Sequence, residues 1–492
     1  DPLWSRGLGD VYKRQGTLQL GAGGATGSLV GDVANNGALA FNRSDTYTFG
    51  GLVSGGGTVS QNGSGTTVLT ANNAYTGGTS ITAGTLQLGA GGATGGIVGD
   101  VANNGALVFN RSDTYTFGGQ VSGGGSVSQI GSGTTVLTGA NTYTGGTTIT
   151  AGTLQLGAGG PTGSIVGNVS NNGTLAFNRS DGYLFGGLIS GGGGVNQLGT
   201  GTTILTANNT YTGGTTITSG TLQLGNGGTS GGLQGDVVNN GVLVVARSDQ
   251  VMLNDVISGS GAVVQNGSGQ TVLKGKNTYS GVTVAMAGSL FVNGDQSAAT
   301  GGTFATGGST LGGTGIIGGN TFVAGTLSPG DLTGAPGTLT ITGDLTLDNA
   351  ATLAYNFGQA GTVGGPLNDL TIVKGNLALN GTLNVATAPG GSFDPGVYRV
   401  ISYDGTLTGS GLTIGTIPSP SFSVQTAVAK QVNLVNTAGL TLNFWDGALA
   451  AGKNNGTVDG GNGFWQNAAG NDNWTNSLGV PNAPYALSLI HI

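Results

Sequence analysis

The sequence predicts an all-β fold: an elongated, right-handed parallel β-helix, which is a solenoid whose short strands stack coil upon coil. Three observations predict it. Glycine supplies 106 of the 492 residues, one motif recurs at a fixed interval, and short β patterns alternate with turn residues throughout. Apolar and polar residues that alternate in short runs bounded by Gly or Asn are typical of strands joined by turns. No window of twelve residues shows a capped amphipathic helix.

The fixed interval is 68 residues. The motif Gly-Thr-Leu-Gln-Leu has a decayed fifth copy at Gly288 and four intact copies, which begin at Gly16, Gly84, Gly152 and Gly220. A second motif, Arg-Ser-Asp, keeps the same interval and begins at Arg43, Arg111, Arg179 and Arg247. Self-similarity at a fixed period indicates a repeat architecture, in which each unit buries its apolar face only against its neighbours.

Each repeat is longer than one solenoid coil. In the first repeat the strand patterns cover residues 17–20, 38–41, 58–60, 67–70 and 79–82. Runs this short do not suit a large sandwich, but they fit a β-helix, in which every coil gives a short strand to each sheet. The glycines that precede these patterns suggest about three coils per repeat. Asn-Asn-Gly, first at 35–37, predicts a turn because Asn tolerates the left-handed region.

Composition divides the natural part of the chain into three segments. Residues 16–287 hold four 68-residue β-helix repeats, and residues 288–440 continue the β pattern without the strict repeat. Nine prolines lie between 329 and 484, whereas the repeats contain only Pro161, so longer excursions are expected in the later part. Residues 441–486 form a truncated β segment that contains three tryptophans, Trp445, Trp465 and Trp474.

The two ends are expected to be foreign to the natural protein. Residues 10–15 and 487–492 resemble the translation of one sequencing-library adapter read on its two strands. We therefore assign 1–15 and 487–492 to adapter-derived artefact, exclude them from the fold, and expect both natural termini to lie beyond the chain. The single histidine, His491, falls in one of these ends.

Composition also limits the chemistry. Only 7% of residues are charged, cysteine is absent, and the formal net charge is −7. These values exclude disulfides and thiolate nucleophiles, leave no usable histidine for a Ser-His-Asp site or a zinc site, and argue against binding nucleic acid. The sequence therefore predicts no catalytic, cofactor-binding or metal-binding residues, no cofactor, and no enzyme.

A carboxylate pair is the remaining catalytic alternative. Asp344 and Asp348 lie four residues apart in a strand region and are expected to share one face. Paired carboxylates serve in glycoside hydrolysis. The favoured interpretation is that the two residues line turns and strand edges.

Two sets of recurring residues each have a functional and a structural interpretation. The Arg-Ser-Asp copies either present a periodic charged stripe to a partner or form exposed turns with a local Arg–Asp pair, and we favour the turns. The three tryptophans either stack on sugars or pack a coil that lacks aliphatic bulk, and we favour packing.

Several spaced motifs together carry a family resemblance. The segment 172–181 is followed in order by Ile-Ser-Gly at 189–191, by 209–217 and by Gly-Thr-Leu-Gln-Leu at 220–224. This pattern resembles the autotransporter-associated β-strand repeat, which occurs in passenger regions of Gram-negative type V secreted proteins. The resemblance covers about 16–287, and Leu-Ser-Pro-Gly at 327–330 and Trp-Asp-Gly at 445–447 resemble neighbouring passenger segments more weakly.

The resemblance implies a location and a partner. It implies a signal peptide, a passenger on the cell surface, at the outer membrane or secreted, and a C-terminal outer-membrane β-barrel of the same chain that assists export. The passenger segment itself is not expected to span a membrane. Neither the ligand nor the organism follows from the sequence.

The function expected from these observations is a passenger stalk for adhesion to a host or abiotic surface or for self-association, without catalysis of its own. Two alternatives stay open. One is a polysaccharide-acting β-helix enzyme, which would need clustered Asp with Arg or Lys in a groove. The other is a passive spacer that carries a functional domain upstream.

Overall fold

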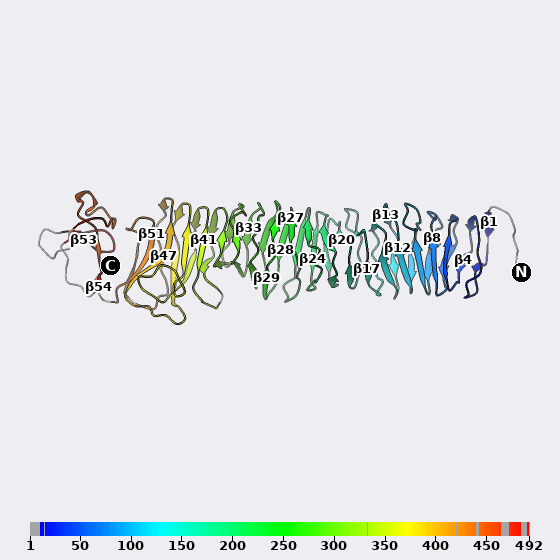
Figure 1. The fold of residues 1–492 in the computed structure, drawn as a ribbon, viewed down its shortest axis with the longest axis horizontal. Coiled ribbons are helices and arrows are strands. Elements are labelled where there is room, and N and C mark those ends of the chain that lie inside the picture. Colours follow the sequence, from blue (N-terminus) through cyan, green and yellow to red (C-terminus); the bar gives the residue numbers. More distant parts are fainter. Residues whose placement is uncertain are drawn as a thin grey trace. The chain divides into compact units, whose positions relative to one another are not determined.

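The computed structural model describes residues 10–13, 15–331, 333–419, 421–438, 442–463, 472–483 and 490–491. It separates into two units, Asp1–Leu243 and Val244–Ile492. Apart from a short 3₁₀ helix, η1 (Ala450–Gly452), all regular structure of the described residues is β (Figure 1). The predicted all-β solenoid is confirmed in each unit, because strands of successive coils pair in parallel.

The first unit contains three long sheets, whose neighbouring strands are all parallel. One sheet runs β2 (Thr17–Leu20), β4 (Ala38–Phe41), β7 (Thr58–Gln61), β9 (Thr79–Ile81), β11 (Val101–Asn103) and β14 (Val121–Ser122). The second runs β5 (Thr46–Phe49), β8 (Thr66–Leu69), β10 (Thr85–Leu88), β12 (Ala106–Phe109), β15 (Ser126–Gln129), β17 (Thr147–Ile149), β19 (Val169–Asn171) and β22 (Ile189–Ser190). The third runs β13 (Thr114–Phe117), β16 (Thr134–Leu137), β18 (Thr153–Leu156), β20 (Thr174–Phe177), β23 (Gly194–Gln197), β25 (Thr215–Ile217) and β27 (Val237–Asn239).

Strands of two further ladders also belong to the first unit. They are β1 (Asp10–Lys13), β3 (Asp32–Asn35) and β6 (Val53–Ser54), and β21 (Gly182–Phe185), β24 (Thr202–Leu205) and β26 (Thr221–Leu224). The backbone of β1, which the sequence assigns to an adapter-derived end, pairs residue for residue with β3. The strand β28 (Val242–Val245) contains the point at which the units are divided.

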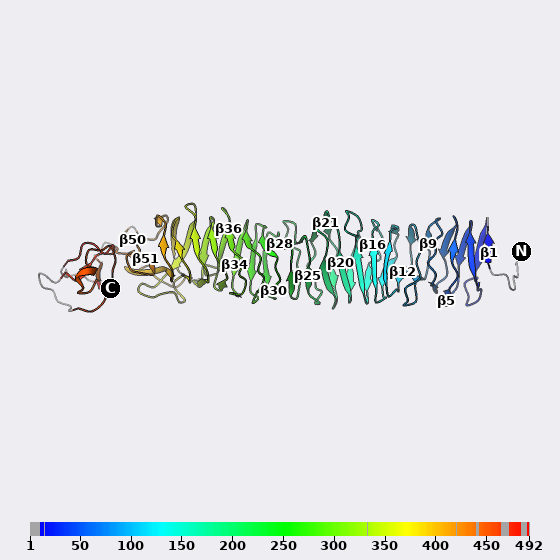
Figure 2. The ribbon, with the colours of Figure 1, turned by 90° about the horizontal axis from the view of Figure 1, so that it is seen from above.

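The 68-residue repeat does not fill a whole number of coils. Successive strands of the second sheet begin 19–22 residues apart, so one repeat holds about three and a third coils. As a result, equivalent strands enter different ladders. The Thr-Leu-Gln-Leu strands β2, β10 and β18 each lie in a different long sheet, and the fourth copy, β26, pairs with β24 in a fourth ladder. Figure 2 shows the stacked coils from a second side.

Apolar side chains of each coil form the core. In β10 the side chains of Leu86 and Leu88 are fully buried, and aromatic rings such as those of Phe109 and Phe117 pack 6.0 Å apart. A second set of tyrosines, one in each repeat, is buried as well. The hydroxyl of each bonds to the hydroxyl of the threonine four residues on, as in Tyr75 with Thr79 at 2.6 Å. A buried hydroxyl needs such a partner.

The Asn-Asn-Gly turn forms as predicted, but for another reason. Neither asparagine of any copy adopts a positive φ. Instead the Asn103 side chain is buried, accepts a hydrogen bond from the Gly105 N–H and donates to the Ser126 carbonyl, while Asn104 Oδ1 accepts from the Gly124 N–H of the next coil. The asparagines therefore join neighbouring coils.

The second unit continues the parallel ladders. One sheet runs β31 (Ala262–Gln265), β33 (Thr283–Ala285), β36 (Thr303–Ala305), β39 (Thr321–Val323), β42 (Leu345–Leu347), β45 (Leu377–Ala378) and β48 (Leu407–Thr408). Another runs β29 (Gln250–Leu253), β32 (Gln270–Leu273), β34 (Ser289–Val292), β37 (Thr310–Gly313), β40 (Thr326–Pro329), β43 (Thr352–Phe357), β46 (Thr382–Thr387) and β49 (Thr413–Ile414). The strand β30 (Ile257–Ser258) also belongs to this unit.

Parallel stacking stops in the third sheet of this unit. It runs β35 (Asp295–Gln296), β38 (Ile316–Ile317), β41 (Thr338–Ile341), β44 (Leu370–Val373), β47 (Gly396–Tyr403), β51 (Gln431–Asn436) and β50 (Phe422–Gln425), and its last two pairings are antiparallel. A small sheet follows, made of β53 (Trp474–Thr475), β52 (Leu442–Trp445) and β54 (Ile490–His491).

Candidate functional site

Each repeat carries one extended loop between its Thr-Leu-Gln-Leu strand and the following strand. We call residues 21–31, 89–99 and 157–167 the repeat loops of the first unit. In the second copy, glycines at four positions hold positive φ, which side-chain-bearing residues rarely adopt: Gly89, Gly91, Gly95 and Gly99. Most loop residues are exposed. The repeat loops are therefore an irregular, exposed surface beside the regular strands.

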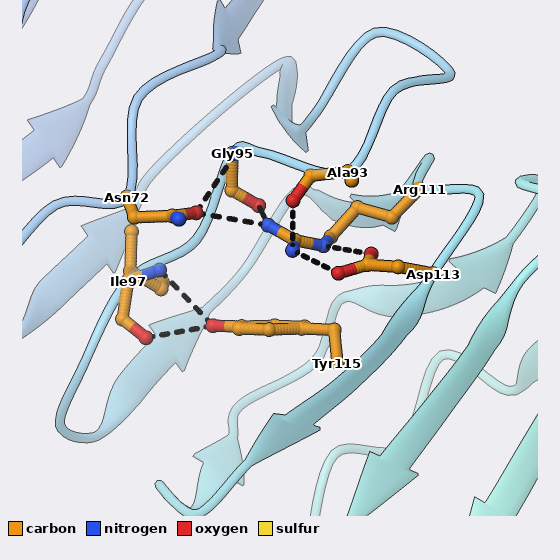
Figure 3. Close-up of polar contacts among 7 residues, drawn as sticks. All are labelled: Asn72, Ala93, Gly95, Ile97, Arg111, Asp113 and Tyr115. Atoms are coloured by element: carbon orange, nitrogen blue, oxygen red, sulfur yellow. Dashed lines mark hydrogen bonds and ion pairs between the residues drawn. The ribbon is translucent and has the colours of Figure 1, made fainter.

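The arginine of the Arg-Ser-Asp motif holds this loop by hydrogen bonds to its backbone (Figure 3). Arg111 is only 5% exposed. Its Nη1 donates to the Gly95 carbonyl and to Asn72 Oδ1, both at 2.9 Å, and its Nη2 donates to the Ala93 carbonyl at 2.5 Å. Two carbonyls of the loop thus receive charge-assisted hydrogen bonds, which are stronger than neutral ones.

Asp113 completes the set of acceptors. Arg111 donates to its two oxygens in a forked arrangement, Nε to Oδ1 at 2.9 Å and Nη2 to Oδ2 at 2.7 Å. The hydrogen bond from Arg111 lowers the pKa of Asp113. All five guanidinium N–H donors therefore have partners inside the protein.

A tyrosine holds the other side of the loop. The Arg111 guanidinium lies 4.7 Å from the ring centroid of Tyr115. The Tyr115 hydroxyl donates to the Ile97 carbonyl at 2.7 Å and accepts from the Ile97 N–H at 3.0 Å, as Figure 3 shows. Burial raises the pKa of this hydroxyl, which stays protonated at neutral pH.

The same cluster recurs in the first and third copies. Arg43 donates to the Gly27 and Ala25 carbonyls, and Arg179 donates to those of Gly163 and Pro161. Both arginines form the forked pair with the aspartate two residues on. The third copy has Ala140 where the second has Asn72, so the side-chain acceptor is not essential to the cluster.

The geometry decides between the two sequence interpretations of Arg-Ser-Asp. A local Arg–Asp pair is present, as expected. The expectation that the whole turn is exposed is wrong, because the arginine is buried and donates to backbone carbonyls. Carbonyl partners of this kind cannot be recognised from residue types in the sequence. A single charged stripe is also wrong, since the strands that follow the motif, β5, β13 and β21, lie in three different ladders.

The surface that the cluster supports is apolar in part. One valine of each repeat loop is exposed: Val30 at 90%, Val98 at 45% and Val166 at 43%. Each lies next to the residue that the tyrosine hydroxyl fixes, Leu29, Ile97 or Ile165. The structure thus presents a small apolar contact once in each of the first three repeats, whereas the fourth has Gln234 at the equivalent position.

The aspartate pair considered for catalysis has structural contacts instead. Asp344 Oδ1 accepts a hydrogen bond from the Asn376 N–H at 2.7 Å, and Asp348 Oδ1 accepts from the Ala350 N–H at 2.9 Å. The two residues stand at opposite ends of β42, where Asp344 joins two neighbouring coils and Asp348 stabilises a turn. Over the described ranges, no group of three His, Cys, Asp or Glu side chains is placed to hold a metal ion.

Two of the three tryptophans meet at the end of the second unit. The rings of Trp445 and Trp474 lie 5.3 Å apart in an edge-to-face arrangement, and Trp474 is buried, which agrees with the packing interpretation. Trp445 is half-buried and lines a cavity with Arg399 and Gln425, two residues that sequence reasoning missed. Trp465 lies outside the described residues. Among the helices of those residues, none has the length and apolar character needed to cross a membrane.

Comparison with known proteins gives two findings. The family model of the passenger-associated-transport-repeat matches residues 59–88, 127–156, 195–224 and 263–292. The first match runs from β7 to β10 and leaves out the repeat loop and the arginine cluster. The chain is also similar to "Adhesin BmaC autotransporter" from Brucella suis biovar 1 (strain 1330), with 48% identity over 236 residues. The match covers 46% of this chain and 7% of that relative, so the chain spans a small part of the relative's length.

Proposed function

Because this chain is a segment of an autotransporter passenger, we propose that it is a β-solenoid stalk for adhesion or self-association. It would act on the surface of a Gram-negative cell or after secretion, joined to the membrane-inserted remainder of its own chain. The observation that carries the proposal is the 48% identity to an autotransporter that is named an adhesin.

The structure supports a stalk because contacts between neighbouring coils dominate it. In a solenoid each coil contacts only its neighbours, so stability adds along the chain. Here the coils are joined by parallel ladders and by asparagine side chains such as Asn104. Such a body can fold coil by coil without cysteine or cofactor.

The surface supports contact rather than chemistry. Charged residues are scarce, and the charged groups of each repeat's arginine cluster are paired with one another or with backbone. What the repeats expose is chiefly threonine, glycine and the loop valines. We propose that this weakly charged surface adheres by apolar and hydrogen-bonding contacts and that no catalysis takes place on it.

The test is attachment of beads coated with the purified chain. Coated beads are expected to aggregate or to attach to cultured cells or to polystyrene, and attachment should persist at 0.5 M salt, where charge–charge contacts are screened over about 4 Å. Albumin-coated beads are the control. Attachment no greater than the control would contradict the proposal and leave the passive spacer. Release of reducing sugar from polysaccharides would instead establish the enzymatic alternative.

A further inference from the structure

The end of the second unit contains a cavity of about 270 Å³. Its walls come from β47, β50, β51 and β52 and from the loop at 361–363. Among the residues that line it are one arginine, three amides and one tryptophan: Arg399, Gln425, Gln431, Asn433 and Trp445. Among the described residues that line it, none is acidic.

Three of these polar residues stand in one row across the antiparallel strands. Arg399 of β47 and Gln425 of β50 are both register partners of Asn433 of β51. Arg399 Nε donates to Asn433 Oδ1 at 2.7 Å, and Asn433 Nδ2 donates to Gln425 Oε1 at 3.0 Å. The hydrogen bonds therefore hold the three side chains in a fixed order along one wall.

Arg399 differs from the arginines of the repeats. It is half-buried, and burial lowers its pKa. Its hydrogen bonds go only to Asn433 and, from Nη1 at 3.0 Å, to the Ser402 hydroxyl, and in the part of the chain that the structure describes no carboxylate pairs with it. Arg111 uses all five donors, whereas Arg399 keeps guanidinium donors for a ligand.

Gln425 stands at the buried end of this row. The residue is fully buried, and its Nε2 has no hydrogen-bond partner within the described residues. Buried donors are nearly always satisfied, because an unsatisfied one costs about 1–3 kcal/mol. Since the side chain is also closed to a water-sized group, it braces Asn433 and makes no ligand contact.

The aromatic wall indicates the kind of ligand. Trp445 is held by a hydrogen bond from its Nε1 to the Gly461 carbonyl at 2.8 Å, and Val397 and Val458 extend the apolar side. A flat ring and hydrogen-bonding amides that line one cavity suit a sugar, which has an apolar ring face and polar edges. A guanidinium fork suits a carboxylate.

We propose that this cavity binds a carboxylate-bearing sugar, with the carboxylate on Arg399, a ring hydroxyl on Gln431, and the ring face against Trp445. The inference rests on the proposed function and deepens it, since it gives the stalk an acidic glycan as its ligand. It also gives the tryptophan segment a second role beside packing.

The first experiment uses the unmodified chain and matched ligands. Methyl glucuronide, methyl galacturonide and a methyl sialoside are compared with their methyl esters by titration calorimetry or ligand-observed NMR. At least one acid is expected to bind at least tenfold more tightly than its own ester. Equal binding of acids and esters, absence of binding by all three acids, or equal binding of inorganic sulfate would overturn the proposal.

Variants then locate the binding. Arg399→Gln and Trp445→Ala are each expected to weaken the acid at least tenfold, with circular dichroism unchanged. The control is Lys374→Gln, an exposed lysine of the same unit that pairs with Asp404, and it should bind as the parent does. Loss in the control, or unchanged affinity in both test variants, would overturn the assignment to this cavity.

The bead-attachment assay distinguishes failure of the cavity proposal from failure of the proposed adhesive function. Attachment without binding of any acid would remove the cavity proposal and leave the adhesive stalk. Binding of an acid by beads that attach to nothing would support the cavity and contradict adhesion.

Discussion

At the scale of single residues, environment gives one residue type two roles. Arg111 donates to two loop carbonyls, to Asn72 and to Asp113. It therefore holds the repeat loop in place from inside the protein. Arg399 has only two side-chain acceptors and faces a cavity. Counting charges in the sequence cannot separate these cases, because the deciding partners are backbone carbonyls and residues from distant strands.

Replacement of Arg111 should free its loop. In Arg111→Ala the loop carbonyls and Asp113 lose their donor, which we expect to cost about 2–4 kcal/mol locally. Amide hydrogen exchange at 89–99 should accelerate by at least about thirtyfold. Asn72→Ala, which reproduces the third copy with its Ala140, should accelerate exchange only at Gly95, whose N–H donates to Asn72 Oδ1, and should change the rest of the loop little. Equal exchange in Arg111→Ala and the parent would show that the cluster does not hold the loop.

Asp369 should make the second unit less stable as pH rises toward neutrality. Its carboxylate is buried, accepts hydrogen bonds from the N–H groups of Gly337 and Asn356, and has a pKa that burial raises to about 7. The unfolded carboxyl titrates near 4. Between about pH 4 and 7 the native state therefore binds more protons, so the free energy of unfolding falls across this window and levels off above it.

The variant Asp369→Asn isolates this effect. It cannot titrate, so urea unfolding of the second unit should lose the part of the pH slope that lies between about pH 4 and 7. The parent and variant are compared at matched pH values, with circular dichroism to show that both are folded. Identical slopes in the two proteins would rule out Asp369 as the source.

At the scale of elements, close approach between coils decides which glycines matter. A Cβ on Gly105 would overlap the Gly84 carbonyl oxygen of the neighbouring coil, although Gly105 has no unusual φ. The glycine is thus required by stacking and not by backbone conformation. Gly92, in the repeat loop, has open space around it and also lacks a positive φ.

Alanine at these two positions should give opposite results. Gly105→Ala is expected to destabilise the first unit by about 1–3 kcal/mol, because two coils must separate. Gly92→Ala should stay within about 0.5 kcal/mol of the parent. Thermal unfolding followed by circular dichroism measures both. A stable Gly105→Ala protein would mean that the coils are not as closely stacked as described.

The elements also show what the sequence could and could not predict. Strands such as β10, with buried Leu86 and Leu88, follow directly from alternation, and about three coils per repeat was the right number. The remaining third of a coil depends on the lengths of the turns, which alternation does not measure. The sequence could not predict the row of Arg399, Asn433 and Gln425. Antiparallel pairing of β47, β51 and β50 brings these residues together from distant positions.

At the scale of the whole molecule, the mismatch between repeat and coil controls how the first unit displays its surface. Because a repeat holds about three and a third coils, equivalent residues pass to another ladder with each copy. The repeat loops with their exposed valines are consequently distributed among the sides of this unit. A stalk of this kind can meet partners from several directions and needs no particular side to face them.

The most direct test of this arrangement is a comparison of two spin-label distances. The chain has no cysteine, so pairs can be introduced cleanly. Gln87 and Thr148 lie three coils apart in one ladder, through Val108 and Ser128, and serve as a ruler of about 14 Å between Cα atoms. Ala102 and Ser170 are equivalent residues of two repeats, on β11 and β19, which belong to different sheets. We expect the second pair to be clearly farther apart than the first. Equal distances would contradict the claim that equivalent residues of successive repeats lie in different ladders.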